Sequence, residues 1–254
     1  MRKTVAGNWK MHHGPGEALE FFRGFDPDLP DGEGPAILVF PPAISLEAVI
    51  DSPDRDRSVQ VGAQNVHHED SGAFTGETSA SMVRGVGATH VLIGHSERRH
   101  VFGETDDDVR RKVEAVLRNE LVPVVCVGET LDERREGRVA DVILRQLDAA
   151  LDALTAGGEF LIAYEPVWAI GTGETATPDD ASAAHEVLKN RLAEAISGDR
   201  AFSIPVLYGG SVNPGNALEL MRAPGVDGVL VGGASLDPDR FARICEAGMT
   251  AATT

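Results

Sequence analysis

Three side chains that could carry out acid–base chemistry follow short apolar runs of this sequence. Lys10 follows "KTVAGNW", His95 follows "HVLIG", and Glu165 follows "FLIAY". Burial disfavours a charged carboxylate, so we expect a raised pKa at Glu165, which suits a general base. An imidazole can donate a hydrogen bond to a substrate oxygen, and an ammonium group can neutralise an anion. Together these groups could remove a proton next to a carbonyl group and stabilise the enediolate that forms.

Two glycine pairs also follow apolar runs, and both suit the binding of an anion. Gly209-Gly210 precedes Ser211, and Gly232-Gly233 precedes Ala234. Either pair alone could be a tight turn. Because glycine has no Cβ, its backbone N–H groups can closely approach a phosphate. The pairs together favour a phosphorylated substrate, and the chemistry above needs no metal or organic cofactor.

The paired histidines do not indicate a metal site. His12-His13 and His67-His68 are adjacent in the chain, whereas zinc-binding histidines on one helix face are spaced i, i+4. The sequence contains neither the nucleotide loop G-x-x-x-x-G-K-[ST] nor the nucleophile motif G-x-S-x-G. We therefore predict no bound metal.

The elements that position these residues are predicted from apolar runs that recur along the chain. Several runs, such as "AILVF", "VPVVCV" and "GVLVGG", are continuously apolar, which is typical of strands buried on both faces of a parallel sheet. Amphipathic spacing predicts a helix over 138–156, and a capping residue before proline predicts helix starts at Thr177-Pro178, Asn213-Pro214 and Asp237-Pro238. The predicted strands are 3–9, 36–40, 59–64, 90–94, 122–128, 160–165, 204–208 and 228–232.

Strands that alternate with helices in this way predict an α/β fold, a single-domain (β/α)8 barrel over residues 1–254 with eight parallel strands ringed by helices. In such a barrel the carboxyl ends of the strands form the active-site mouth, and phosphate commonly binds after strands seven and eight. The two glycine pairs stand at those places. An open doubly wound sheet is the alternative.

Composition limits the possible partners and compartments. The formal net charge is −17, which does not suit nucleic acid or an anionic membrane surface. No apolar stretch is long enough to span a membrane, and residues 1–10 lack the apolar run of a secretory signal. Cys126 and Cys245 are expected to be reduced thiols, which indicates a cytoplasmic enzyme. The acidity fits either a salty cytoplasm or general solubility.

The stretch "AYEPVWAIGTGETATP" (163–178) contains the pattern G-x-G-x-x-A of a dinucleotide-binding turn. Such a turn follows its strand tightly and opens the next helix, whereas this one starts six residues after Glu165 and precedes the cap at Thr177. An apolar strip between a proline and two glycines is better explained as a hinged lid. The predicted lid residues are Pro166, Val167, Trp168, Ala169, Ile170, Gly171, Thr172 and Gly173.

Eight ordered motifs make the chain resemble the triosephosphate isomerase family from end to end. They are "AGNWKM" (6–11), "GAQN" (62–65), "GAFTGE" (72–77), "IGHSERR" (93–99), "CVGET" (126–130), "AYEPVWAIGTG" (163–173), "YGGSV" (208–212) and "DGVLVGGASL" (227–236).

The resemblance implies a role for each candidate site residue. Glu165 is implied as the proton acceptor, His95 as the electrophile and Glu97 as a supporting carboxylate. It also implies a homodimer, in which a loop with Thr75 at its tip reaches the partner near its site. The implied reaction interconverts glyceraldehyde 3-phosphate and dihydroxyacetone phosphate in glycolysis and gluconeogenesis. The implied substrate-binding residues are Asn8, Lys10, Gly171, Ser211, Gly232 and Gly233.

The chain departs from the family pattern at His12 and His13, which carry none of the roles above and which we expect to modify the dimer surface. Two alternatives stay open. Another phosphate-binding barrel isomerase or epimerase would share the glycine pairs, and a non-catalytic barrel would share the fold.

Overall fold

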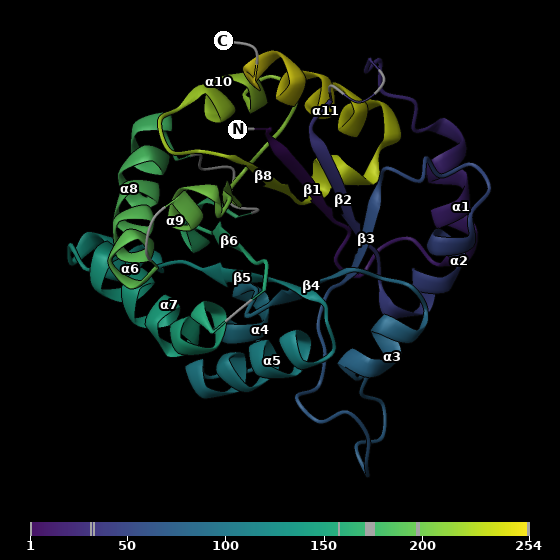
Figure 1. The fold of residues 1–254 in the computed structure, drawn as a ribbon. Helices are drawn as coiled ribbons and strands as arrows, with labels where there is room; N and C mark the ends of the chain where they lie inside the picture. The colour runs from purple at the N-terminus through teal and green to yellow at the C-terminus, as the bar shows by residue number, and fades with distance from the viewer. Residues whose placement is uncertain are drawn as a thin grey trace.

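The computed structural model describes residues 2–30, 32, 34–156, 158–170, 176–196 and 199–252. Within these residues the strands pair in chain order and close into a parallel barrel, because β1 pairs with both β2 and β8 (Figure 1). The strands are β1 (Thr4–Asn8), β2 (Ala36–Phe40), β3 (Gln60–Ala63), β4 (His90–Ile93), β5 (Val122–Val127), β6 (Leu161–Tyr164), β7 (Val206–Tyr208) and β8 (Gly228–Val231).

Helices surround the strands on the outside of the barrel (Figure 1). The α-helices are α1 (Pro15–Gly24), α2 (Leu46–Asp51), α3 (Ala80–Gly85), α4 (Ser96–His100), α5 (Asp106–Arg118), α6 (Leu131–Arg135), α7 (Val139–Thr155), α8 (Pro178–Ala195), α9 (Asp199–Ser203), α10 (Ala217–Arg222) and α11 (Pro238–Ala252). Short 3₁₀ helices are η1 (Ala43–Ser45), η2 (Val167–Ala169) and η3 (Gly233–Leu236).

The predicted (β/α)8 barrel is therefore confirmed. Each predicted strand contains an observed one, and the observed strands are shorter by at most two residues. The alternative of an open doubly wound sheet is wrong, because Val5 pairs with Val229 as well as with Ile37 and the sheet has no edge there.

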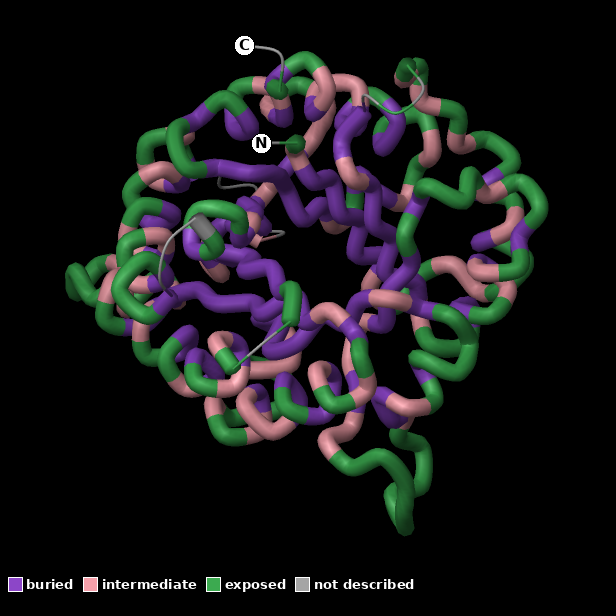
Figure 2. Tube along the Cα trace, in the orientation of Figure 1, coloured by how far each residue is buried: buried purple, intermediate pink, exposed green. Residues whose placement is uncertain are grey.

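Alternate residues of each strand bury into two different cores, which explains why the strands are continuously apolar. In β5, Val124 and Cys126 belong to a cluster inside the barrel, whereas Val125 belongs to the larger cluster between strands and helices. Figure 2 shows the ring of strands as buried and the helices as buried mainly on their inward side. Gly62 belongs to the interior packing, because a Cβ there would lie 2.4 Å from a ring carbon of Phe40.

The helix starts predicted from capping residues are confirmed in two of three cases. Thr177 and Asp180 form a reciprocal capping box at α8, and the Asp237 side chain accepts a hydrogen bond from the Arg240 amide at the start of α11. The start predicted at Asn213-Pro214 is wrong. There Asn213 Oδ1 accepts a hydrogen bond from Gly215 N in a turn, and α10 begins only at Ala217.

One segment projects from the barrel between β3 and α3, around residues 67–78, and is largely exposed (Figures 1 and 2). It contains Thr75, the residue predicted at the tip of a dimer loop. Among the described residues, no helix is long and apolar enough to cross a membrane.

Candidate active site

A cavity of about 460 Å³ is lined by residues from the carboxyl ends of the strands. It brings together Lys10, His95 and Glu165, which lie far apart in the sequence. Of the other predicted residues, it is also lined by Asn8, Ile170, Ser211, Gly232 and Gly233.

The remaining predicted residues lie outside the cavity lining. Glu97 contacts two lining residues without lining the cavity itself. Thr75 lies on the projecting loop. Pro166, Val167, Trp168 and Ala169 follow β6 beside the cavity, with Ala169 buried in η2. The predictions at Gly171, Thr172 and Gly173 fall outside the described residues.

Lys10 is held in an unusual backbone conformation by hydrogen bonds on both sides. Its φ of 52° lies in the left-handed region, which costs a non-glycine residue on the order of 1 kcal/mol or more. Asn8 Oδ1 accepts a hydrogen bond from Lys10 N at 3.0 Å, and Gln64 Nε2 donates one to Lys10 O at 2.8 Å. The ammonium group then meets Glu97 Oε1 at 2.6 Å. The sequence "GNWKM" is thus folded to turn this lysine into the cavity.

His95 lies at the point where β4 passes into α4. Gly94, with φ 68°, makes the turn, and the Arg99 side chain fixes it by donating to Gly94 O at 2.8 Å and to Cys126 O at 3.2 Å. His95 caps α4, because its Nδ1 accepts a hydrogen bond from Glu97 N at 3.3 Å. With Nδ1 used as an acceptor, the proton of a neutral imidazole lies on Nε2.

Glu165 is buried, and both of its carboxylate oxygens have partners. Oε1 lies 3.0 Å from His95 Nε2, and Oε2 accepts a hydrogen bond from Ser96 N at 2.9 Å. Burial alone raises the pKa of Glu165, but the charge and hydrogen bond of His95, the Ser96 amide and Lys10 together hold that pKa below its usual value. The raised pKa predicted from the apolar run is therefore wrong for this state of the site.

The same contact acts on His95 in the opposite direction. Burial lowers the pKa of the imidazole, but the neighbouring Glu165 carboxylate outweighs burial and raises the pKa above its usual value. An imidazolium would carry a second proton on Nδ1. That proton would point at the Glu97 N–H, which already donates to Nδ1, and two donors repel each other. The hydrogen bonds therefore fit a neutral ring that donates from Nε2.

The backbone packs closely around Glu165. A Cβ on Gly209 would lie 2.8 Å from Glu165 Cγ, and one on Gly128 would lie 1.8 Å from Glu165 O. Gln146 of α7 holds Gly128 through hydrogen bonds to its N–H and carbonyl groups. Burial raises the pKa of the Cys126 thiol, and the Glu165 carboxylate raises it further, so the thiol stays protonated beside the base. These contacts fix the carboxylate in place.

The segment after Glu165 is anchored through a tryptophan. Trp168 Nε1 donates to Glu129 Oε1 at 2.8 Å, and the Tyr164 hydroxyl contacts both carboxylate oxygens at 3.1 Å. Arg134 lies over the Trp168 ring, 4.5 Å from its centroid, and 3.8 Å from Glu129. Burial raises the pKa of Glu129 despite these donors.

Several residues of this site were not predicted from the sequence. Ser96 directly follows His95 and supplies a backbone donor, for which a side-chain search gives no signal. Glu129 could have been found as the acid of the "CVGET" motif. His12, for which we predicted no role in the site, also lines the cavity. Arg240, from the first turn of α11, lines it as well.

Within the part of the chain that the structure describes, no group of three or more histidine, cysteine, aspartate or glutamate residues could hold a metal ion. The described lining supplies carboxylate, imidazole, ammonium, guanidinium, side-chain amide and hydroxyl groups, together with backbone amides.

The fold and the cavity define a (β/α)8 barrel in which carboxylate, imidazole and ammonium side chains lie beside glycine-rich loops at the mouth. The family described as "Triosephosphate isomerase" matches residues 3–248, and the chain belongs to that family of isomerases. A triosephosphate isomerase of Solibacter usitatus is 47% identical over 247 residues, covering 96% of this chain and 99% of that protein. One from Roseiflexus castenholzii is 47% identical over 242 residues (94% and 95%), and one from Lactobacillus acidophilus is 42% identical over 239 residues (93% and 94%).

Proposed function

We propose that the cavity binds a triose phosphate and interconverts glyceraldehyde 3-phosphate and dihydroxyacetone phosphate, a step of glycolysis and gluconeogenesis. The observation that carries this proposal is the contact of 3.0 Å between Glu165 Oε1 and His95 Nε2 in a cavity that also contains Lys10 and the glycine-rich loops.

The phosphate end of the substrate is assigned to the loops after β7 and β8. Ser211, Gly232 and Gly233 line that part of the cavity, and a Cβ on Gly233 would have no neighbour within 4 Å. Backbone N–H groups there can bind the phosphate oxygens without any side chain in between. Asn8 and Lys10 approach the same space from β1.

Proton transfer is assigned to Glu165, which takes a proton from carbon and returns it to the neighbouring carbon. His95 donates from Nε2 to the substrate oxygen that becomes negative, and Lys10 adds its charge. A glutamate base with a neutral histidine electrophile is the arrangement known for this family. In the described state His95 Nε2 lies 3.0 Å from Glu165 Oε1, so the imidazole N–H must turn from this carboxylate before it can donate to a substrate oxygen.

The segment that begins at Pro166 is proposed as a lid. Its first turn, η2, is held by Glu129, and α8 fixes its far end through the capping box at Thr177. Closure over the substrate would exclude water and protect the enediolate, which otherwise loses its phosphate.

The decisive experiment is a coupled assay of the purified protein with glyceraldehyde 3-phosphate. We expect formation of dihydroxyacetone phosphate without added metal or nucleotide. Lack of activity in protein of confirmed full-length mass, after removal of bound ions and ligands, would exclude the proposed reaction.

We also propose that the protein is a homodimer. The projecting loop exposes Phe74, and exposed Met11 and Ile44 line a separate hollow beside His12 and His13. In a two-fold dimer the same surface of both subunits meets, so a protrusion and a hollow on one subunit would let each loop enter the hollow of the partner. The loop that carries Thr75 is the segment proposed to enter.

A cytoplasmic location is proposed on the state of the cysteines. Cys126 and Cys245 are free thiols, and both are buried. Such thiols are typical of a reducing compartment.

A further inference from the structure

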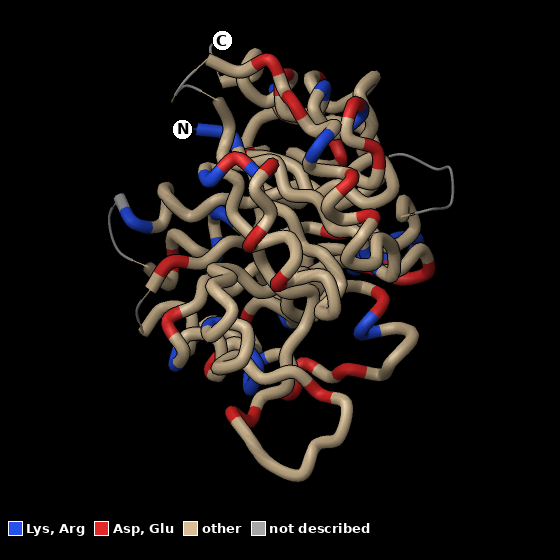
Figure 3. Tube along the Cα trace, turned by 90° about the vertical axis from the view of Figure 1, so that its right-hand side faces the viewer, with Lys and Arg blue, Asp and Glu red and all other residues tan. Residues whose placement is uncertain are grey.

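The candidate cavity differs in charge from the rest of the chain. The protein has 40 acidic and 23 basic residues, and Figure 3 shows acidic positions spread over its helices and loops. Among the described residues the cavity lining has the opposite balance, because it contains Lys10 and Arg240 and one carboxylate, that of Glu165. An anionic substrate must therefore approach a negative protein before it reaches the cationic groups of the cavity.

Lys10 is not the group that supplies most of this attraction. Its ammonium nitrogen lies 2.6 Å from Glu97 Oε1, and its side chain is only 27% exposed. The charge of Lys10 is therefore largely offset before the substrate arrives. Glu165 and His95 likewise pair with each other.

Arg240 lines the cavity from the first turn of α11 and is exposed. Its backbone N–H donates to Asp237 Oδ1 at 2.9 Å, which caps α11. Among the described residues, no hydrogen bond or ion pair involves its guanidinium group. This charge therefore remains available to an approaching anion.

We propose that Arg240 is the residue that captures the phosphate group of the substrate from solution and guides it to the loops at Ser211 and Gly232. The inference rests on the proposed triose phosphate chemistry and adds a substrate-capture residue to it. A guanidinium group suits this task because it stays charged and presents several N–H donors to phosphate oxygens.

Capture by charge has a characteristic dependence on salt. Exposed charges act over about 30 Å at an ionic strength of ~0.01 M but over only about 3 Å at ~1 M. Electrostatic guidance changes the rate of encounter, which enters kcat/KM and leaves kcat alone when encounter limits the reaction. Enzymes of this family are known to work near the diffusion limit, so their kcat/KM reports encounter.

The test compares Arg240→Gln and Arg240→Lys with wild type and with Arg57→Gln. Arg57 lies between α2 and β3, at the opposite end of the barrel, so its replacement removes the same charge far from the cavity. Steady-state kinetics with glyceraldehyde 3-phosphate are measured over an ionic strength of ~0.01 to ~1 M, with thermal unfolding as a check on folding.

At low salt, Arg240→Gln is expected to lower kcat/KM by about threefold to tenfold, with kcat unchanged, and the loss should vanish at high salt. Arg240→Lys should retain most of kcat/KM, and Arg57→Gln should match wild type. With D-glyceraldehyde, which has no phosphate, Arg240→Gln and wild type should have equal kcat/KM values at every salt concentration.

Equal salt dependence of kcat/KM in Arg240→Gln and wild type would overturn the capture role. An equal loss in Arg57→Gln would overturn it too, because the effect would then belong to net charge. In either case an active wild type leaves the proposed function intact, whereas inactivity of wild type would count against that function and not against Arg240 in particular.

Discussion

The Glu165 carboxylate and the His95 imidazole form one unit, with Oε1 and Nε2 3.0 Å apart and each residue shifting the pKa of the other. Glu165→Gln keeps the shape of the side chain but removes the base. We expect kcat to fall by about 10³-fold, because a general base contributes about 10² to 10⁴. Binding of inorganic phosphate should change little.

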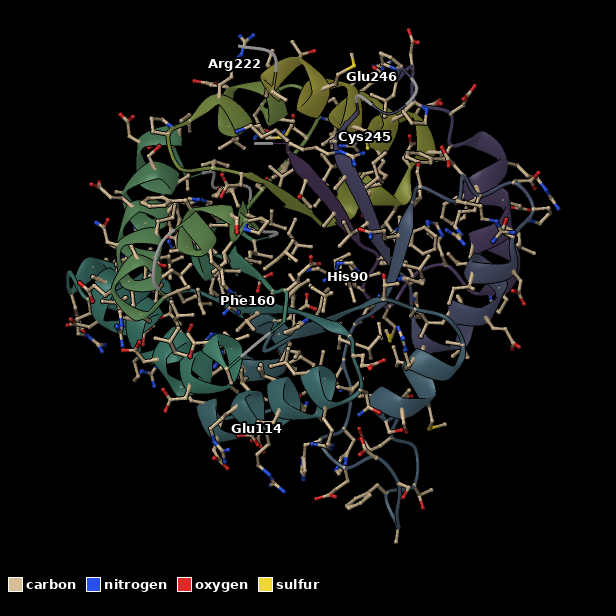
Figure 4. The ribbon with its side chains drawn as sticks, in the orientation of Figure 1. His90, Glu114, Phe160, Arg222, Cys245 and Glu246 are labelled. Atoms are coloured by element: carbon tan, nitrogen blue, oxygen red, sulfur yellow. The ribbon has the colours of Figure 1, made fainter. Side chains whose placement is uncertain are left out.

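The matched control is Glu114→Gln on α5, where the carboxylate is exposed on the outside of the barrel (Figure 4). Coupled assays of both variants should show wild-type turnover for the control. A decrease at Glu165→Gln of less than about tenfold, or about 1.4 kcal/mol, would mean that another group is the base.

Gly209 makes room for that base. Because an added Cβ would lie 2.8 Å from Glu165 Cγ, Gly209→Ala must move the carboxylate or the loop. A misplacement of about 1 Å can cost about 10²-fold in rate, so we expect kcat to fall by about 10- to 100-fold. Gly85→Ala is the control, since a Cβ there has no neighbour within 4 Å. Wild-type kcat in Gly209→Ala would show that the site relaxes around the methyl group.

The sequence predicted the barrel and the three reactive side chains because both depend on local pattern. Continuously apolar runs indicate strands, and the strands then place Lys10, His95 and Glu165 at the same end of the barrel. What could not be predicted depends on contacts between distant segments. Ser96 N and Glu165 Oε2 are separated by 69 positions, and that contact helps to lower a pKa that burial alone would raise.

Local pattern also gave a wrong prediction where the same residue pattern fits both a helix start and a turn. Asn213-Pro214 has the composition of a helix start, but the same residues form a turn in which Asn213 Oδ1 accepts from Gly215 N. Arg240 shows the other limit. An arginine on a helix is usually a solvated surface charge, and only the folded structure shows that this one lines the cavity.

Glu129 is predicted to hold the proposed lid through Trp168. Removal of the carboxylate in Glu129→Ala eliminates the acceptor of the 2.8 Å hydrogen bond from Trp168 Nε1. We expect acrylamide quenching of tryptophan fluorescence to increase, because the only other tryptophan, Trp9, is fully buried. Glu136→Ala, at an exposed carboxylate near α6, serves as the control. Unchanged quenching in Glu129→Ala would show that other contacts suffice to hold Trp168.

The proposed dimer can be tested at the projecting loop. Phe74 packs on the His67 ring, 4.0 Å between centroids, and is 43% exposed. A charge at this position should oppose burial against a partner, so Phe74→Asp is expected to shift sedimentation velocity from dimer to monomer. Phe202→Asp is the matched control, because Phe202 is 68% exposed on α9, away from this loop. A monomeric wild type would contradict the proposal directly.

His90 is predicted to make the fold sensitive to acid. It lies inside the ring of strands (Figure 4), contacts Thr89 Oγ1 at 2.7 Å, and is buried deeply enough to lower its pKa to about 4. An unfolded histidine has a pKa near 6.5, so between pH about 6.5 and about 4 the unfolded state binds more protons than the folded state. The free energy of unfolding must therefore fall as the pH falls through this window, by about 3 kcal/mol for this residue.

The test is His90→Leu, which removes the titrating group. Urea unfolding at fixed protein concentration should show a smaller loss of unfolding free energy between pH 7 and pH 4 than in wild type. The exposed residue His100 provides the control, since His100→Leu should keep the wild-type slope. Equal slopes in wild type and His90→Leu would show that His90 is protonated in the fold without cost. The comparison uses the slope with pH, so any effect of the substitution on the absolute stability does not enter it.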